Sequence, residues 1–277
     1  MNFICCNGNF LPADTPVLFA NNRGFKYGDG LFETMKMIDG EIPLADLHFE
    51  RLFLSIRMLE MKMARLNKEK LLQHIKDLCI KNQCSHLAKV RLAVYRNENN
   101  EAEYLVECGS LSEDVNQWNK EGLKIDIFPF SRKNNDAYSN IKSANFLPYV
   151  MAGLYAEEHG VEDCLVLNSE NKIADASKAN IFLIKNGEVF TPALNQGCVN
   201  GVMRRFLLEK LKEQNYRIHQ HQISIEDLSN ADEVFLTNAV YGIRWVKSFR
   251  DHQYKFGLTS KIYQSIISNL NKYPGEI

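Results

Sequence analysis

The chain has 277 residues, 45% of them hydrophobic, which is enough to bury one or two sizeable cores. Its 33 basic and 34 acidic residues give a formal net charge of −1, and the absence of a basic run or zinc-finger spacing argues against a nucleic-acid partner. Residues 1–16 lack a charged region followed by an apolar stretch, and no apolar run could span a bilayer. We therefore expect a cytoplasmic protein with no membrane partner.

The first third of the chain mixes strand and helix patterns. Glycine-containing turns flank an alternating segment at 32–38, which predicts a strand. Apolar spacing predicts helices over 44–61 and 68–81. Alternation then predicts paired strands at 89–96 and 103–108. Helices and hairpins are segregated, as in α+β proteins.

Polar and glycine residues between 109 and 122 suggest a linker. We expect a smaller N-terminal α+β domain at 1–112, a linker at 113–121 and a larger C-terminal α+β domain at 122–277, with a small-molecule cleft between the domains. The second domain is expected to contain strands from Leu123 and at 164–167, 233–237 and 243–246, helices at 146–159, 201–213 and from about Thr259, and a 180–191 hairpin turning at Asn186–Gly187.

Seven scattered cysteines form no CxxC pair, and reduced, mostly buried thiols explain them best. Cys5 and Cys6 are neighbours without further clustered ligands. His219 and His221 alternate along a predicted strand without a third ligand. We therefore expect no metal site.

Lys142 is a lone cation in SNIKSANFLPYVMAG, just before a largely uncharged helix. Most lysines are solvated, and this segment alone favours that interpretation. The functional alternative is a lysine whose pKa is lowered by burial and that attacks an aldehyde carbon.

Three other stretches carry possible chemistry. The helix expected at 201–213 begins with amides near Val202 and Met203 that lack intrahelical acceptors, and these suit a phosphate as well as an ordinary loop. Asp175, between an apolar strand and a turn, either caps that turn or holds a proton on a heterocyclic nitrogen. Arg51 lies among apolar helix residues and is either solvated or a phosphate ligand.

These stretches occur in a recognisable order. Across its whole length the chain resembles the class IV aminotransferases, the fold-type IV enzymes that use pyridoxal 5′-phosphate (PLP), which include branched-chain and D-amino-acid aminotransferases and aminodeoxychorismate lyase. The resemblance rests on RGFKYGDGLFET, ERL, IKSANF, VLNSENKIADASKANIF, TPALNQGCVNGVMRR and ADEVFLTNAV. Each motif is weak alone, but six in this order are specific. The implied fold is a two-domain α+β fold like that of D-amino-acid aminotransferase, and the implied assembly is a homodimer.

The resemblance also implies roles. Lys142 matches the lysine that forms a Schiff base with PLP, and Asp175 falls where the family has a glutamate facing the pyridine nitrogen. The residues that match phosphate ligands are Arg51, Val202, Met203, Asn238 and Ala239. Because aspartate is one methylene shorter than glutamate, either the backbone must approach the cofactor or a water must bridge. The charge of a carboxylate is retained.

The candidate substrate-pocket residues match different members of the family. Tyr27 and Phe32 match pocket walls, and Thr34 sits where the lyase has a threonine near the reacting carbon. Arg91 resembles the pocket arginine of branched-chain enzymes, and Arg96 resembles the carboxylate-binding arginine of the other branches. A regular strand points these two arginines to opposite faces, so both cannot easily serve one pocket.

The resulting hypothesis is a transaminase that moves an amino group between an amino acid, with branched-chain ones as candidates, and a 2-oxo acid. The alternative is a 4-amino-4-deoxychorismate lyase that releases pyruvate and 4-aminobenzoate. A third alternative, against which Lys142 argues, is a non-catalytic binding protein on the same fold.

Overall fold

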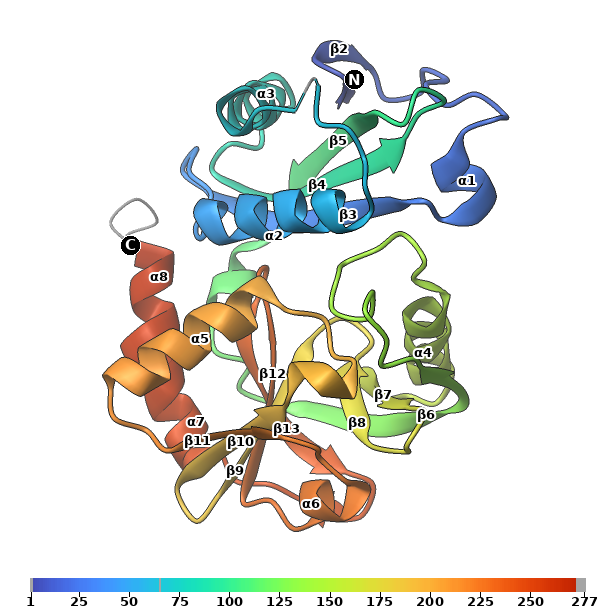
Figure 1. Cartoon of the computed structure of the whole chain (residues 1–277). Helices are drawn as coiled ribbons and strands as arrows, with labels where there is room; N and C mark the ends of the chain where they lie inside the picture. The colour runs from blue at the N-terminus through green and yellow to red at the C-terminus, as the bar shows by residue number, and fades with distance from the viewer. Residues whose placement is uncertain (1, 65, 273–277) are drawn as a thin grey trace. The chain divides into compact units, whose positions relative to one another are not determined.

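The computed structural model describes residues 2–64 and 66–272 (Figure 1). It divides into two compact units, each with its own sheet. Unit 1 comprises Met1–Val115, Ile141–Asn145 and Leu270–Ile277, and unit 2 comprises Asn116–Asn140 and Phe146–Asn269. The expected α+β, two-domain organisation is confirmed. Among the described residues, no helix is both long and apolar enough to cross a membrane.

Unit 1 is built on a five-stranded sheet in the order β2-β1-β5-β4-β3. Its elements are β1 (Phe3–Cys6), β2 (Asn9–Pro12), α1 (Arg23–Tyr27), β3 (Gly30–Ile38), α2 (Ala45–Met58), α3 (Lys68–Lys81), β4 (Leu87–Arg96) and β5 (Ala102–Ser110). Helix α2 packs against β3, and α3 packs against β1 and β5 (Figure 1). The strand and helix predictions at 32–38, 44–61, 68–81, 89–96 and 103–108 are confirmed.

The alternation of β4 decides which face of the sheet carries chemistry. Val90, Leu92 and Val94 are buried in the apolar core of unit 1. Arg91 and Ala93 lie between them in sequence and point to the other face, where they are only partly buried. This second face therefore has room for polar groups.

Unit 2 contains a sheet in the order β11-β10-β9-β12-β13-β6-β7-β8, with β14 beside β13. Its strands are β6 (Leu123–Lys133), β7 (Asp163–Asn168), β8 (Ile173–Ala176), β9 (Asn180–Lys185), β10 (Glu188–Pro192), β11 (Ile218–His221), β12 (Glu233–Asn238), β13 (Gly242–Phe249) and β14 (His252–Gln253). Its helices are α4 (Leu147–Glu158), α5 (Val202–Glu213), α6 (Ile225–Ser229), α7 (Gly257–Ile262), a π-helical turn (Tyr263–Ile267) and the start of α8 (Ser268–Lys272).

The 180–191 hairpin prediction is confirmed, because Asn186 and Gly187 have φ values of 52° and 77° and join β9 to β10. Both angles suit a two-residue hairpin turn. The structure differs at Asp175, which lies inside β8 rather than after a strand. The short hairpin of β1 and β2 and the helices α1 and α6 were not predicted.

The units also differ from the predicted domains at two segments. The chain from Leu270 on belongs to unit 1, although it was predicted in the C-terminal domain. The segment Ile141–Asn145, which contains Lys142, belongs to unit 1 although the flanking residues belong to unit 2. The cause is hydrogen bonding of this segment to the edge of β3. The predicted linker at 113–121 begins with a short 3₁₀ helix at Glu113–Asn116, just after the end of β5 at Ser110.

Candidate active site

The backbone around Lys142 is held as a short extension of the unit 1 sheet. The carbonyl of Lys142 accepts a hydrogen bond from the amide of Phe32 at 3.0 Å, and the amide of Ala144 donates to Gly30 at 2.8 Å. The Lys142 ammonium lies 4.3 Å from the centroid of the Phe32 ring. These main-chain bonds, at Lys142 and at Ala144, hold the lysine over a buried aromatic ring.

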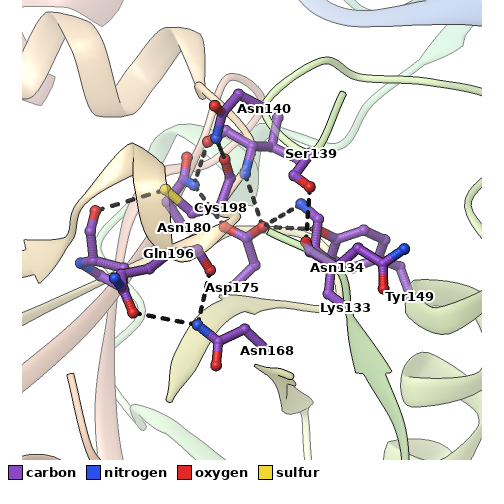
Figure 2. Close-up of polar contacts among 12 residues, drawn as sticks. Lys133, Asn134, Ser139, Asn140, Tyr149, Asn168, Asp175, Asn180, Gln196 and Cys198 are labelled. Atoms are coloured by element: carbon purple, nitrogen blue, oxygen red, sulfur yellow. Dashed lines mark hydrogen bonds and ion pairs between the residues drawn. The ribbon is translucent and has the colours of Figure 1, made fainter. Parts of the chain in front are cut away.

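The residue that precedes this segment is anchored within unit 2. The side-chain amide of Asn140 donates to the carbonyls of Leu194 at 2.8 Å and Cys198 at 2.6 Å, and its own carbonyl accepts from the amide of Asn200 at 2.9 Å. Figure 2 shows Asn140 beside Cys198. The chain is thus fixed just before Lys142 to the loop that leads into α5.

Arg91 shares the second face of the unit 1 sheet with Lys142. In the β3–β4 pairing, Thr34 is opposite Arg91 and Phe32 is opposite Ala93. The Arg91 guanidinium lies 4.1 Å from the same Phe32 ring centroid. Burial lowers the pKa of Arg91, and the charge of Glu107, which is opposite Arg91 in the β4–β5 pairing, acts in the other direction. Among the described residues, none forms a hydrogen bond or ion pair with the Arg91 guanidinium. A partly buried cation in this state is suited to an anionic ligand.

Arg96 is engaged in holding loops. Its Nε donates to Asp29 at 2.8 Å, one terminal nitrogen donates to the carbonyl of Leu59 at 2.8 Å, and the other donates to Asn100. All three nitrogens of the guanidinium thus have partners within unit 1. Tyr27, on α1, is 66% exposed and lies beside the Arg23 guanidinium.

Arg51 takes part in a buried ion pair under α2. Its Nε donates to Glu33 at 2.8 Å, and a terminal nitrogen donates to the second oxygen of that carboxylate. The Nδ1 of His48 lies 2.6 Å from Glu33. Burial raises the pKa of Glu33, but the charge of Arg51 and the His48 contact outweigh it and leave this pKa at about 2. Arg51 therefore binds both oxygens of the Glu33 carboxylate.

Asp175 is at the centre of the polar network drawn in Figure 2. It is 2% exposed. One carboxylate oxygen accepts from the Asn180 amide at 2.8 Å, and the other accepts from the Tyr149 hydroxyl at 2.7 Å and the Val199 amide at 2.9 Å. The Lys133 ammonium lies 3.4 Å from the second oxygen. Burial raises the pKa of Asp175, and Lys133 with these hydrogen-bond donors acts in the opposite direction.

The start of α5 has the features of an anion seat. Gly201 precedes the helix and provides no capping side chain, and both Val202 and Met203 are buried. A side chain at Gly201 would collide with Asn180, which lies at the start of β9. In the β9–β12 pairing, Asn180 is opposite Thr237. The buried Thr237 hydroxyl has no hydrogen-bond partner among the described atoms.

The first amides of α5, at Val202 and Met203, and the Thr237 hydroxyl can donate hydrogen bonds to the oxygens of a phosphate. The residues present therefore fit a phosphorylated cofactor. Asn238 shapes the turn that follows β12, because its side-chain oxygen accepts from the amides of Val240 at 3.0 Å and Tyr241 at 2.9 Å. Ala239 lies within this turn.

The expected site residues are divided between the units. Unit 1 carries Tyr27, Phe32, Thr34, Arg51, Arg91, Arg96 and Lys142, and unit 2 carries Asp175, Val202, Met203, Asn238 and Ala239. Sequence reasoning missed Lys133, Asn140, Tyr149, Asn180 and Thr237. A signal existed for Asn140, Tyr149, Asn180 and Thr237, because each lies in a stretch that was singled out for its neighbours, whereas Lys133 lies outside these stretches.

Residues 30–249 match the family model described as amino-transferase class IV, so the chain belongs to that family. Class IV enzymes are PLP-dependent, and PLP is the cofactor of this protein.

The similar proteins and solved structures include members of the family with different activities. The aminodeoxychorismate lyase of Bacillus subtilis is 26% identical over 247 residues, which cover 87% of this chain and 84% of that one. The D-alanine aminotransferase of Staphylococcus haemolyticus is 20% identical, with 99% and 98% covered. The branched-chain aminotransferase of Thermoproteus uzoniensis, solved with norvaline, matches with a TM-score of 0.88 at 19% identity, with 99% and 96% covered.

Proposed function

We propose that the protein is a transaminase that moves an amino group between an amino acid, with branched-chain ones as candidates, and a 2-oxo acid. The observation that carries this proposal is the Arg91 guanidinium, which lies at the same Phe32 ring as Lys142. The charge of Glu107 acts on this guanidinium, but no described residue forms an ion pair with it. Amino acids and 2-oxo acids share a carboxylate, and a guanidinium binds a carboxylate with paired hydrogen bonds.

The roles of the other residues follow from their surroundings. PLP supplies an aldehyde that bonds to an amine and a pyridine ring that accepts electrons from the bound substrate. Lys142 would hold the aldehyde carbon and, once displaced by substrate, carry the α-proton on its Nζ. The amides of Val202 and Met203, with the Thr237 hydroxyl, would hold the phosphate.

Asp175 would face the pyridine nitrogen, and Lys133 would help to keep its carboxylate ionised in a buried position. Arg51, which matches a phosphate ligand of the family, would add a phosphate contact while it stays paired with Glu33. Asn238 and Ala239 would close the phosphate seat through the turn after β12.

The second candidate is 4-amino-4-deoxychorismate lyase. It is favoured by Thr34, which lies directly opposite Arg91 in the β3–β4 pairing and is partly buried. A hydroxyl at this place could deliver a proton to a leaving pyruvate. A lyase relative over most of the chain supports the same candidate.

One pair of incubations separates the two reactions. Holoenzyme is mixed with branched-chain amino acids and 2-oxoglutarate, and separately with 4-amino-4-deoxychorismate. We expect glutamate in the first mixture and neither pyruvate nor 4-aminobenzoate in the second. The reverse pattern, with no transamination of any amino acid offered, would establish the lyase instead.

Arg91→Gln is expected to raise the KM for both the amino acid and the 2-oxo acid by roughly 10–100-fold, because it removes a charge-assisted carboxylate contact of about 1.5–3 kcal/mol. Arg96→Gln is the matched comparison from the same strand. It should instead lower the melting temperature, because it loses contacts to Asp29, Leu59 and Asn100, with a smaller change in KM. A larger KM effect from Arg96→Gln would transfer the carboxylate role to Arg96.

We further propose a homodimer. Helix α4 exposes apolar side chains at helical spacing, with exposed fractions of 64% for Leu147, 49% for Val150, 42% for Met151 and 53% for Leu154. Val150→Glu is expected to shift the protein from dimer to monomer in size-exclusion chromatography with light scattering. Lys124→Glu, on an exposed strand position, is the charge control. A wild-type monomer at micromolar concentration would contradict the proposal.

A further inference from the structure

Unit 1 contains a cluster of three cysteines that play no part in the site described above. Cys79 lies in the last turn of α3, Cys84 follows that helix, and Cys108 lies on β5. Their three sulfur atoms are within 4.8 Å of one another. Cys79 and Cys84 are buried, and Cys108 is partly exposed. The residues are 5 and 24 positions apart along the chain, so packing alone brings them together.

The cluster is held by a defined set of contacts. The Cys84 thiol donates to the sulfur of Cys108 at 3.6 Å. The Asn82 side-chain amide donates to the same sulfur at 3.3 Å and to the carbonyl of Phe3 at 2.9 Å, and its oxygen accepts from the Phe3 amide at 2.8 Å. Asn82 thereby ties α3, β1 and β5 to one sulfur atom, as outer-shell residues do around metal ligands.

We propose that Cys79, Cys84 and Cys108 bind a thiophilic divalent cation of the Zn²⁺ type. A zinc–sulfur bond of about 2.3 Å places tetrahedral thiolates about 3.8 Å apart. The Cys84–Cys108 distance of 3.6 Å and the 4.8 Å limit for the group are close to that spacing. Small side-chain movements complete the site.

Charge favours a divalent over a monovalent cation. Three thiolates around a divalent ion leave one net negative charge, and around a monovalent ion they leave two, which costs more to bury. Cysteine binds a metal ion as the thiolate, so binding releases protons from the thiols of the cluster. No fourth histidine, cysteine or carboxylate joins the group within the described chain. A water molecule on the accessible side of Cys108 takes the fourth position.

The test uses reduced holoenzyme and Co²⁺, a coloured substitute for Zn²⁺. Titration is expected to give one Co²⁺ per chain, with intense thiolate-to-cobalt charge-transfer bands that disappear when Zn²⁺ is added. Cys84→Ser and Cys108→Ser should lose these bands and bind at least tenfold more weakly. Cys6→Ser, a partly buried thiol of the same sheet, is the control and should behave like the wild type. The bound PLP spectrum verifies that each variant is folded.

A second measurement needs no variant. N-Ethylmaleimide should alkylate Cys108 in the metal-free wild-type protein and should not do so when Zn²⁺ is present, as mapped on peptides. The proposal is overturned if Co²⁺ gives no stoichiometric thiolate bands, or if both serine variants keep them. It is also overturned if reduced protein exposed to air loses two hydrogens by forming a Cys84–Cys108 disulfide and Zn²⁺ does not prevent this.

Discussion

Lys142→Ala is expected to lower the rate of amino-group transfer by about 10⁴-fold or more. The side chain that would bond the PLP aldehyde is also the one that would carry the α-proton, so its removal takes away two functions at once. PLP binding should be weakened but not abolished, because the α5 amides and Asp175 are unchanged. Single-turnover measurement of 2-oxo acid formation, together with PLP titration, checks both parts.

The control for this substitution is Lys124→Ala, which removes an exposed lysine on β6 and should leave the activity unchanged. Partial rescue of Lys142→Ala by added small amines would support the proton-transfer role. If Lys142→Ala keeps more than about a tenth of the wild-type rate, a loss far below the 10²–10⁴-fold that a general base contributes, Lys142 is not that group.

Asp175→Asn has the second largest expected effect. The substitution keeps the shape and removes the charge, so a protonated pyridine nitrogen would lose its partner. We expect kcat to fall by about 10²–10³-fold with a smaller change in KM, in line with the loss of one electrostatic group in a buried site. Steady-state kinetics and the absorption spectrum of bound PLP provide the measurement.

The pH dependence of this residue gives an independent check through Lys133. The positive charge of Lys133 opposes the rise in the Asp175 pKa that burial causes. Lys133→Met removes that charge, so the pKa of Asp175 should rise further and the acidic limb of the kcat profile should move to higher pH. An unchanged acidic limb in Lys133→Met, or near-normal kcat in Asp175→Asn, would show that the ionised carboxylate does not assist the reaction.

Asp175 falls where the resemblance to the family implies a glutamate. From sequence, the missing methylene required a closer backbone or a bridging water. The structure shows a third feature, because Lys133 and Tyr149 both contact the carboxylate and hold it in one orientation. Burial raises the pKa of the Tyr149 hydroxyl, and the neighbouring charge of Asp175 raises it further. The contacts from Lys133 and Tyr149 therefore fix the orientation of the short Asp175 side chain.

Local sequence patterns were sufficient to predict much of the fold. The Asn186–Gly187 hairpin, the α3 helix capped by Asn67 and the alternation of β4 all depend on neighbours in sequence. The motif order was sufficient for the family. These features are encoded within short windows, where turn chemistry and periodicity act directly.

Contacts between distant segments could not be predicted. Tyr149 reaches Asp175 across 26 positions, and Arg96 reaches Asp29 across 67. The first contact depends on how α4 packs against β7, and the second depends on the loop before β3. The choice between Arg91 and Arg96 and the grouping of three cysteines therefore required three-dimensional coordinates.

The central claim is that Lys142 bonds to PLP, and borohydride reduction tests it most directly. Reduction of the holoenzyme converts a carbon–nitrogen double bond to a stable single bond, and peptide mass spectrometry then locates the pyridoxyl group. We predict one modified residue per chain, at Lys142 in the peptide that contains IKSANF. Modification of another lysine, such as Lys133 beside Asp175, or of none, would contradict the assignment.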